Sequence, residues 1–245
     1  DFRESQCSRK CFICASMLQK IINLTVRDVR FPTSLEQHGS DAMHTDPDYS
    51  AVYVVLDTDS GLKGFGLTFT LGKGTEIVVC AVQALAGLIV WTSLQDIVSN
   101  FRGFYRLLTS DGQMRWLGPE KGVIHLATAA VLNAVWDLWA RAEGKPLWKL
   151  LVDMDPKQII SCIDFRYITD VLTEEEALDI LVKAKGGKQQ REEEMLSQGY
   201  PAYTTSCAWL GYSDQQLKQV PGLFNTTCSI PLRSGLLFLF FCFFF

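Results

Sequence analysis

The side chains that could bind a small polar molecule gather in one loop near the N-terminus of this chain. Residues 32–50 are rich in Gly, Asp, Pro and His, and they include Ser40, Asp41 and Tyr49. The hydroxyl and carboxylate groups of these residues can hydrogen-bond a hydroxylated ligand. The pattern alone favours a polar surface loop without a ligand, because long loops are often functional but need not be.

Three cysteines near the N-terminus have a spacing that suggests metal binding, but the ligand set is incomplete. Cys7, Cys11 and Cys14 are followed by no second cluster with matching spacing and no nearby histidine. Structural zinc takes four ligands, so we expect no metal there. The other cysteines are expected to be buried free thiols, which fits a reducing compartment: Cys80, Cys162, Cys207, Cys228 and Cys242.

Other short motifs do not support chemistry. Residues 66–73 miss the spacing of a phosphate-binding loop by one residue. Lys183 and Lys185 lie in the charged stretch 183–194, which is typical of a solvated loop and helix surface. His125 lies within an apolar run, and we expect it to be a hydrogen-bonded histidine of the core or of an interface.

Composition indicates a globular protein with a substantial core. Of the 245 residues, 48% are hydrophobic and 20% are charged, and the net charge of −4 gives no case for nucleic-acid binding. Residues 1–19 lack a secretory signal, so we expect a mitochondrial or cytosolic protein. The apolar run 236–245 is too short to cross a bilayer, which takes about 20 residues, but it favours self-association.

The order of elements predicts a small α+β module at the start of the chain. Alternating apolar residues predict strands at 21–31, 51–56 and 62–71, which together form a three-stranded antiparallel meander. Apolar periodicity and stop signals then predict helices at 75–90, 94–108, 120–142 and 147–151.

Strand and helix alternate in the second part of the chain. We expect strands at 159–165 and 200–209, and helices that begin at the capping boxes of Thr173 and Ser213. This pattern indicates an α+β capping domain followed by the start of an incomplete β/α barrel, since a full barrel takes about 200 residues or more. The expected divisions are 1–19 (unmatched), 20–155 (capping domain), 156–220 (barrel start) and 221–245 (aberrant apolar tail).

Longer segments of the chain resemble the enolase superfamily of mandelate racemase/muconate lactonizing type. Residues 129–146 (AAVLNAVWDLWARAEGKP) are similar to the long helix of its capping domains, and Leu150-Leu151 supply the Leu pair that follows. The family usually continues with glycine, where this chain has Val152-Asp153. Further segments, together within residues 20 to 220, look like the L-fuconate dehydratase branch: 26–33, 41–49, 101–105, 109–112 and 118–122.

The resemblance implies a magnesium-dependent hydro-lyase that removes water from L-fuconate, a sugar acid, to give 2-keto-3-deoxy-L-fuconate. Mg²⁺ stabilises the enediolate formed when the proton next to the carboxylate is removed. The family carries a Lys-x-Lys pair, three acidic metal ligands and a histidine on its barrel strands, and none can be matched here. We therefore expect no catalytic and no metal-ligating residue in this chain, and no Mg²⁺ bound by it.

The resemblance also gives the polar loop a role, because the corresponding loop of the family closes over the sugar acid. By position it assigns Gly39, Ser40, Asp41 and Tyr49 as substrate-binding residues. Two classes of function stay open. The chain is either an incomplete hydro-lyase that is inactive alone, or a non-catalytic binding or dimerisation module from a truncated splice-type variant. We expect no nucleic-acid partner and no transmembrane span.

Overall fold

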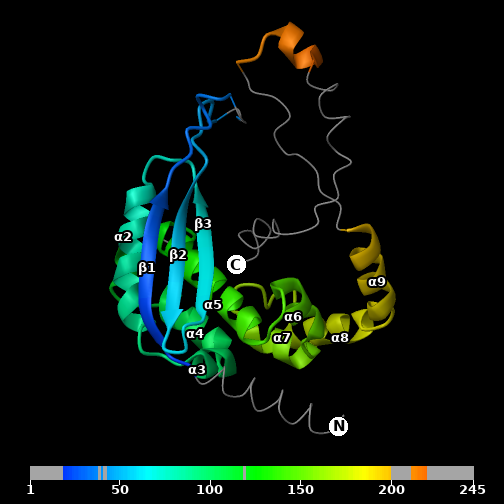
Figure 1. The fold of residues 1–245 in the computed structure, drawn as a ribbon. Coiled ribbons are helices and arrows are strands. Elements are labelled where there is room, and N and C mark those ends of the chain that lie inside the picture. Colours follow the sequence, from blue (N-terminus) through cyan, green and yellow to red (C-terminus); the bar gives the residue numbers. More distant parts are fainter. Residues whose placement is uncertain (1–18, 38–39, 41–42, 118–119, 200–210, 220–245) are drawn as a thin grey trace.

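A three-stranded antiparallel sheet opens the structure. The computed structural model describes residues 19–37, 40, 43–117, 120–199 and 211–219. Strands β1 (Ile21–Val29), β2 (Ser50–Thr58) and β3 (Lys63–Thr70) lie in the order β1-β2-β3 (Figure 1). The predicted meander is therefore confirmed.

Period-two alternation in the central strand decides which face of the sheet is buried. Val52, Val54 and Leu56 of β2 are fully buried, and the residues between them are half-buried. Successive side chains of a strand point to opposite faces, so one face of the sheet meets the core. Gly61 has a φ of 82° in the β2–β3 turn, a backbone conformation that glycine adopts without a steric penalty.

The buried face of the sheet is covered by helices. In chain order these are α2 (Thr75–Leu85), the 3₁₀ turn η1 (Ala86–Leu88), α3 (Leu94–Ser99), α4 (Phe101–Thr109), the 3₁₀ turn η2 (Met114–Trp116) and α5 (Val123–Ala142). Figure 1 shows this two-layer arrangement, with the sheet in front of the helices.

The structure has two helices where the sequence predicts one. The sequence predicts a continuous helix over 94–108, whereas α3 ends at Ser99 and α4 begins at Phe101. Asn100 separates them because its backbone leaves the helical region (φ −141°, ψ 57°) and its side-chain Oδ1 accepts the Gly103 N–H at 3.1 Å. Asparagine is a strong N-cap residue, and here its capping overrides the amphipathic period.

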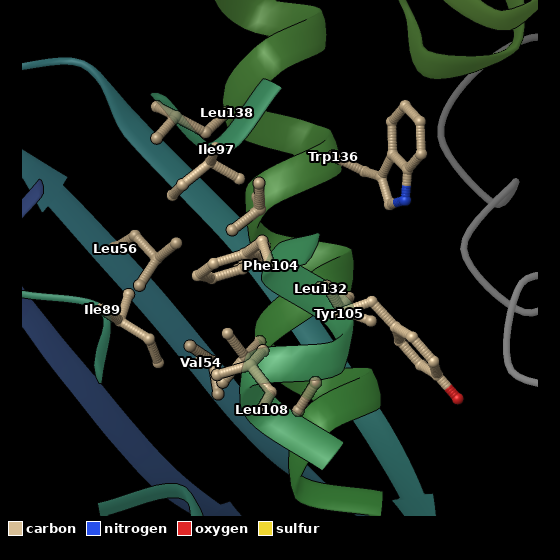
Figure 2. Close-up of a cluster of buried hydrophobic side chains, with 14 of the residues drawn as sticks. Val54, Leu56, Ile89, Ile97, Phe104, Tyr105, Leu108, Leu132, Trp136 and Leu138 are labelled. Carbon is tan, nitrogen blue, oxygen red and sulfur yellow. The ribbon is translucent and has the colours of Figure 1, made fainter. Parts of the chain in front are cut away.

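Helix α5 is the centre of the core. Its small residues lie against β3, where a Cβ on Gly64 or Gly66 would overlap the α5 backbone at Ala134. Its large residues pack on the other helices: Trp136 lies 4.4 Å from Phe101, measured between ring centroids. Figure 2 shows Val54 and Leu56 of the sheet facing the helices, with Trp136 on the other side of α5. Small residues toward the strand let the two backbones approach, so α5 is buried on more than one side.

Polar side chains of α5 hydrogen-bond the backbone of the edge strand β3. Asp137 Oδ2 accepts the Phe65 N–H at 2.9 Å and the Arg141 Nε–H at 2.7 Å. Asn133 Nδ2 donates to the Leu67 carbonyl at 2.9 Å. An edge strand otherwise presents unpaired backbone groups to other chains. Three successive residues of α5 therefore have three roles. Trp136 places its ring in the core, Asp137 hydrogen-bonds the edge strand, and Leu138 packs against β3.

Length and apolar composition would allow α5 to cross a membrane. It is the one helix of the described residues that meets this criterion, and 67% of its most apolar stretch is buried inside the fold. A core helix of a globular protein has the same character, because helices that are apolar on several sides are buried in large cores as well as in membranes.

Two short helices follow, and the second replaces a predicted strand. Helix α6 spans Leu147–Asp153 and α7 spans Pro156–Cys162, where the sequence predicts a strand at 159–165. That prediction is wrong because Asp155 accepts the Lys157 N–H at 3.0 Å as N-cap and Pro156 occupies the first turn. Proline at this position is prearranged for a helix, and it outweighs the β-branched residues that come next.

The described residues from 163 to 199 contain two further helices and no strand. Helix α8 (Glu174–Ala184) begins at the predicted capping box of Thr173, and α9 spans Lys188–Gln198. A short helix over 214–219 begins at Ser213, whose Oγ accepts the Gln216 N–H at 3.4 Å. The strand predicted at 200–209 lies outside the described residues, so the barrel start stays a prediction.

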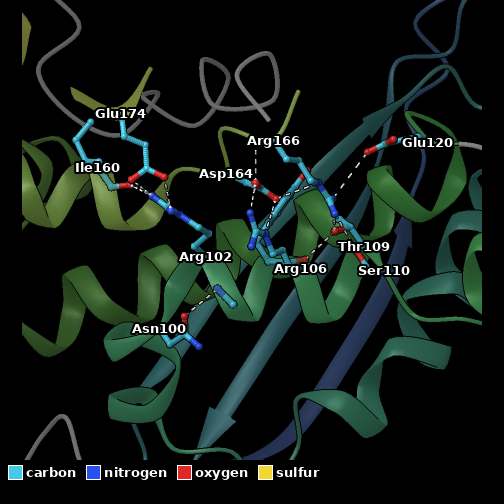
Figure 3. A network of polar contacts seen from close by, with 12 residues as sticks. Asn100, Arg102, Arg106, Thr109, Ser110, Glu120, Ile160, Asp164, Arg166 and Glu174 are labelled. Atoms are coloured by element: carbon cyan, nitrogen blue, oxygen red, sulfur yellow. Dashed lines mark hydrogen bonds and ion pairs between the residues drawn. The ribbon is translucent and has the colours of Figure 1, made fainter. Parts of the chain in front are cut away.

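Two arginines of α4 hold the segment between α7 and α8 (Figure 3). Arg106 donates to both oxygens of Asp164, at 3.0 and 2.8 Å, and the Asp164 side chain is 5% exposed. Arg102 donates to both oxygens of Glu174, at 2.7 and 3.1 Å, and to the Ile160 carbonyl. These contacts fix the second part of the chain to the helical layer.

The two cysteines in the described residues differ from each other. Cys162 is a buried free thiol, and burial raises its pKa above the usual range. Cys80 is also free but is exposed on α2, so the expectation that it is buried is wrong. Only one face of α2 meets the core, and Cys80 lies outside the buried set of that helix. The three N-terminal cysteines, Cys207, Cys228 and Cys242 lie outside the described residues.

Candidate functional site

The polar loop begins at an arginine that ties three segments together. Arg30 follows β1 and donates to both carboxylate oxygens of Asp28, to Glu76 of α2 at 2.7 Å, and to the Gly72 carbonyl at 2.5 Å. The guanidinium holds the pKa of Asp28 below its usual range, since it favours the charged carboxylate. The start of the loop is thereby fixed to the β3–α2 turn.

The two arms of the loop are cross-linked at its base. Thr33 Oγ1 donates to the Pro47 carbonyl and accepts the Tyr49 N–H, each at 2.9 Å. Asp48 Oδ1 accepts both the backbone N–H of Ser34, at 3.1 Å, and its hydroxyl, at 2.6 Å. These two hydrogen bonds lower the pKa of Asp48, which therefore stays ionised at neutral pH.

Two of the four predicted substrate contacts lie in the described residues. Ser40 is half-buried in the loop. Tyr49 is half-buried at the loop base, where its ring stacks on Phe69 with centroids 5.7 Å apart. Gly39 and Asp41 lie outside the described residues. The structure therefore gives Tyr49 a packing role, and it leaves the assignment of all four as substrate-binding residues a prediction.

A small hollow lies at the base of the loop. It has a volume of about 190 Å³ and is lined by Arg30, Phe31, Pro32, Asp48, Gly72 and Lys73. Lys73 is exposed in the β3–α2 turn between two glycines with positive φ, Gly72 at 98° and Gly74 at 86°. A Cβ on Gly72 would come within 3.0 Å of the Asp48 Cβ, so this turn and the loop base fit closely together.

The position of Lys73 beside the loop base is not predicted from the sequence. Lys73 ends the segment 66–73, whose spacing differs by one residue from that of a phosphate-binding loop. A signal was available, because a lysine between two glycines at a strand-to-helix turn presents a cation beside backbone that can adopt positive φ. Its proximity to the loop base depends on the pairing of β2 with β3, which follows from the register of the sheet.

The described residues do not offer a site for a divalent cation. No group of three or more His, Cys, Asp or Glu side chains gathers among them in an arrangement that could hold a metal. Magnesium prefers oxygen ligands from carboxylates. The acidic residues near the loop, Asp28 and Asp48, are instead engaged by Arg30 and Ser34. Within the described residues, the acidic side chains near this loop therefore do not form a ligand set that fits Mg²⁺.

The Lys183–Lys185 pair lies at the surface, as predicted. Both residues are exposed where α8 ends, and Lys185 Nζ lies 3.1 Å from Asp155 Oδ2. The neighbouring helix α9 has no buried residue. This confirms the prediction of a solvated surface for the charged stretch.

The meander sheet with helices on one face has the α+β architecture expected of a capping domain of the enolase superfamily. Residues 21–152 match the family described as mandelate racemase / muconate lactonizing enzyme, N-terminal domain, which is more than half of the chain. The chain therefore belongs to this family. The resemblance found in the sequence and the α+β capping fold are both confirmed.

The chain is also similar to individual proteins of known sequence or structure. Mitochondrial enolase superfamily member 1 of Pongo abelii is 74% identical over 218 residues, which are 88% of this chain and 48% of the relative. L-galactonate dehydratase of Hypocrea jecorina is 51% identical over 195 residues, or 79% of this chain and 43% of the relative. The crystal structure of human mitochondrial enolase superfamily member 1 matches with a TM-score of 0.82 and 71% identity over 86% of this chain and 48% of that one. The chain spans about half the length of these relatives.

Proposed function

We propose that this chain is the substrate-capping part of a sugar-acid dehydratase. The observation that carries the proposal is the polar loop with its rigid base, in a chain that is 51% identical to a protein named L-galactonate dehydratase. The substrate class is an aldonic acid such as L-fuconate. Ser40 and Tyr49, with Gly39 and Asp41, contact its hydroxyl groups, and Lys73 binds its carboxylate.

We further propose that the 245-residue chain does not dehydrate L-fuconate by itself. Proton abstraction next to a carboxylate requires stabilisation of the enediolate, which Mg²⁺ supplies in the family when it is bound. The described residues contain no ligand cluster for that ion. What they supply is binding and the exclusion of water by a closing loop. The location that fits the names of the relatives is mitochondrial, with cytosolic as the alternative.

A chimera tests the capping role. Residues 20–155 of this chain would replace the matching segment of the Hypocrea jecorina enzyme, and dehydration of L-galactonate and L-fuconate would be followed. We expect turnover of at least one sugar acid, with KM raised about tenfold by Lys73→Ala, which removes a charge-assisted hydrogen bond. Ser40→Ala and Tyr49→Phe should raise KM by smaller factors. Ser99→Ala, a change of the same kind on α3, is the control.

The capping role fails if the chimera folds and no sugar acid is turned over. It also fails if Lys73→Ala, Ser40→Ala and Tyr49→Phe leave KM at the level of Ser99→Ala. A near-ultraviolet circular dichroism spectrum that matches that of the parent enzyme shows that the chimera is folded, so that loss of activity can be assigned to the loop.

A dimerisation module is the second candidate function. The sheet face turned away from the helices carries aromatic side chains, among them Phe69, which is 41% exposed, and Tyr53 and Phe65, whose rings lie 6.4 Å apart. Clustered apolar side chains at a surface favour association. Sedimentation of the chain with Phe69→Ser tests this role: a dimer that dissociates in the variant supports it, and a monomeric parent chain contradicts it.

A further inference from the structure

A second hollow lies away from the polar loop, between the end of α4 and the start of α5. It has a volume of about 260 Å³ and is lined on one side by Arg166 and Tyr167, in the segment after α7. Figure 3 shows four of its residues. The complete lining is polar apart from one isoleucine: Thr109, Ser110, Arg115, Glu120, Ile124, His125, Arg166 and Tyr167. None of these residues belongs to the site described above.

Two arginines give this hollow its positive charge. Arg166 donates to the hydroxyls of Ser110 and Thr109 at 3.2 and 3.4 Å, and it shares Asp164 with Arg106. Arg115 is exposed, and its guanidinium has no ion-pair partner among the described residues. Guanidinium groups match carboxylate and phosphate oxygens because their N–H groups form a planar fork.

His125 adds a hydrogen-bond donor that has no acceptor. Its Nδ1 accepts the Lys121 N–H at 3.1 Å, so the neutral ring carries its proton on Nε2. Burial lowers the pKa of His125, which favours this neutral form. Nε2 is shielded from solvent and has no hydrogen-bond partner within the described ranges. A buried donor left unpaired is costly, so an acceptor in the hollow would be stabilised.

Glu120 provides a negative charge at the same place, and its carboxylate accepts a hydrogen bond from the Tyr167 hydroxyl, which raises the pKa of Tyr167. Its Oε1 lies 3.7 Å from His125 Nε2 and 4.0 Å from an Arg166 nitrogen, both beyond hydrogen-bond distance. Lys121 adds further positive charge beside the hollow, while Asp164 is engaged by both Arg106 and Arg166. Positive charge therefore exceeds negative charge, and the one carboxylate that faces the donors does not satisfy them.

We propose that this hollow is a binding site for a small oxyanion, a carboxylate or a phosphate group. Arg115 and Arg166 hold the charge, the hydroxyl of Ser110 and the Nε2–H of His125 donate to the remaining oxygens, and Glu120 swings away when the anion enters. The site is independent of the proposed sugar-acid contacts and of any metal.

Titration of the 245-residue chain at constant ionic strength tests the proposal, with inorganic phosphate in one arm and acetate in the other. We expect saturable binding of at least one probe, accompanied by a shift of the His125 Nε2 nitrogen resonance. Arg115→Gln should weaken binding at least about tenfold, because it removes a charge-assisted contact. Glu120→Gln should tighten binding several-fold, since the competing carboxylate is lost.

Arg27→Gln is the matched control, because Arg27 is an exposed arginine on β1 with the same charge. It should leave the affinity unchanged. Misfolding cannot produce the tighter binding expected of Glu120→Gln. Because Arg115→Gln should weaken binding and Glu120→Gln should strengthen it, the pair separates an effect on binding from an effect on stability. The proposal is overturned if neither probe saturates, if Arg27→Gln weakens binding as much as Arg115→Gln, or if Glu120→Gln fails to tighten it. Saturation by phosphate alone or by acetate alone identifies which oxyanion the site takes.

Discussion

At the scale of single residues, the acidic side chains of this domain act as fixed acceptors. Asp48 accepts two hydrogen bonds from Ser34, Asp137 caps the edge strand, and Asp164 lies between Arg106 and Arg166. A carboxylate that accepts several hydrogen bonds or faces arginine is stabilised in its charged form. Each of these carboxylates joins two segments of the chain, because its oxygens are hydrogen-bonded or ion-paired to a neighbouring segment.

Removal of the edge cap tests this view. Asp137→Ala leaves the Phe65 N–H without its acceptor and Arg141 without its partner. We expect a loss of about 1–3 kcal/mol in the free energy of unfolding, the usual cost of an unsatisfied polar group. Denaturant titration measures it, with the exposed Asp170→Ala as control. Equal stability of the two variants would show that the edge does not depend on Asp137.

The junction at Asp164 should depend on pH. Arg106 and Arg166 lower the pKa of Asp164 in the folded chain, with the hydrogen bonds from Arg106 as the largest cause. Its stabilising contribution is therefore fully present above the unfolded pKa of about 3.9 and is lost as the pH falls through the lower folded value. Hydrogen exchange of the amides in 164–176 would be compared between the chain and Asp164→Asn.

The expected result for this pair is slower exchange in the parent chain near neutral pH and a difference that shrinks as the pH falls below about 4. A difference between the two chains that stays constant across this range would mean that the ionised carboxylate does not hold the junction.

At the scale of elements, strand alternation predicts the meander because one sheet face is buried and the period of two is clear. The long core helix follows from its apolar run and its Gly-Lys-Pro stop. The break at Asn100 and the helix at 156–162 could not be predicted from periodicity, because single capping residues decide both. The hollow near Lys73 depends on contacts between segments distant in sequence, which no local pattern contains.

Glycine at the contact between β3 and α5 should be essential for packing. Gly66→Ala places a methyl group against the α5 backbone at Ala130 and Ala134. We expect destabilisation of about 1–3 kcal/mol or more, as for overpacked cores. Gly87→Ala, where a Cβ meets nothing within 4 Å, is the control. Thermal unfolding that is unchanged in Gly66→Ala would mean that the helix and strand can separate without penalty.

At the scale of the whole molecule, the described chain is a two-layer capping domain with a helical extension. The sheet carries the polar loop at one end, α4 anchors the segment that leads to α8, and α5 joins both through the core. The charged surfaces of α8 and α9 contrast with the aromatic outer face of the sheet. In this arrangement the residues that we propose to contact the substrate lie on a loop whose base is cross-linked by hydrogen bonds, and the described residues hold no cluster of metal ligands.

The most direct test of this account is an activity and metal-binding measurement on the purified 245-residue chain. It would be incubated with Mg²⁺ and L-fuconate or L-galactonate, product formation would be followed by mass spectrometry, and Mg²⁺ binding would be followed by calorimetry. The Hypocrea jecorina L-galactonate dehydratase serves as the positive control. We predict no 2-keto-3-deoxy acid above the blank and no saturable Mg²⁺ binding. Catalytic turnover of either sugar acid by this chain would contradict the account.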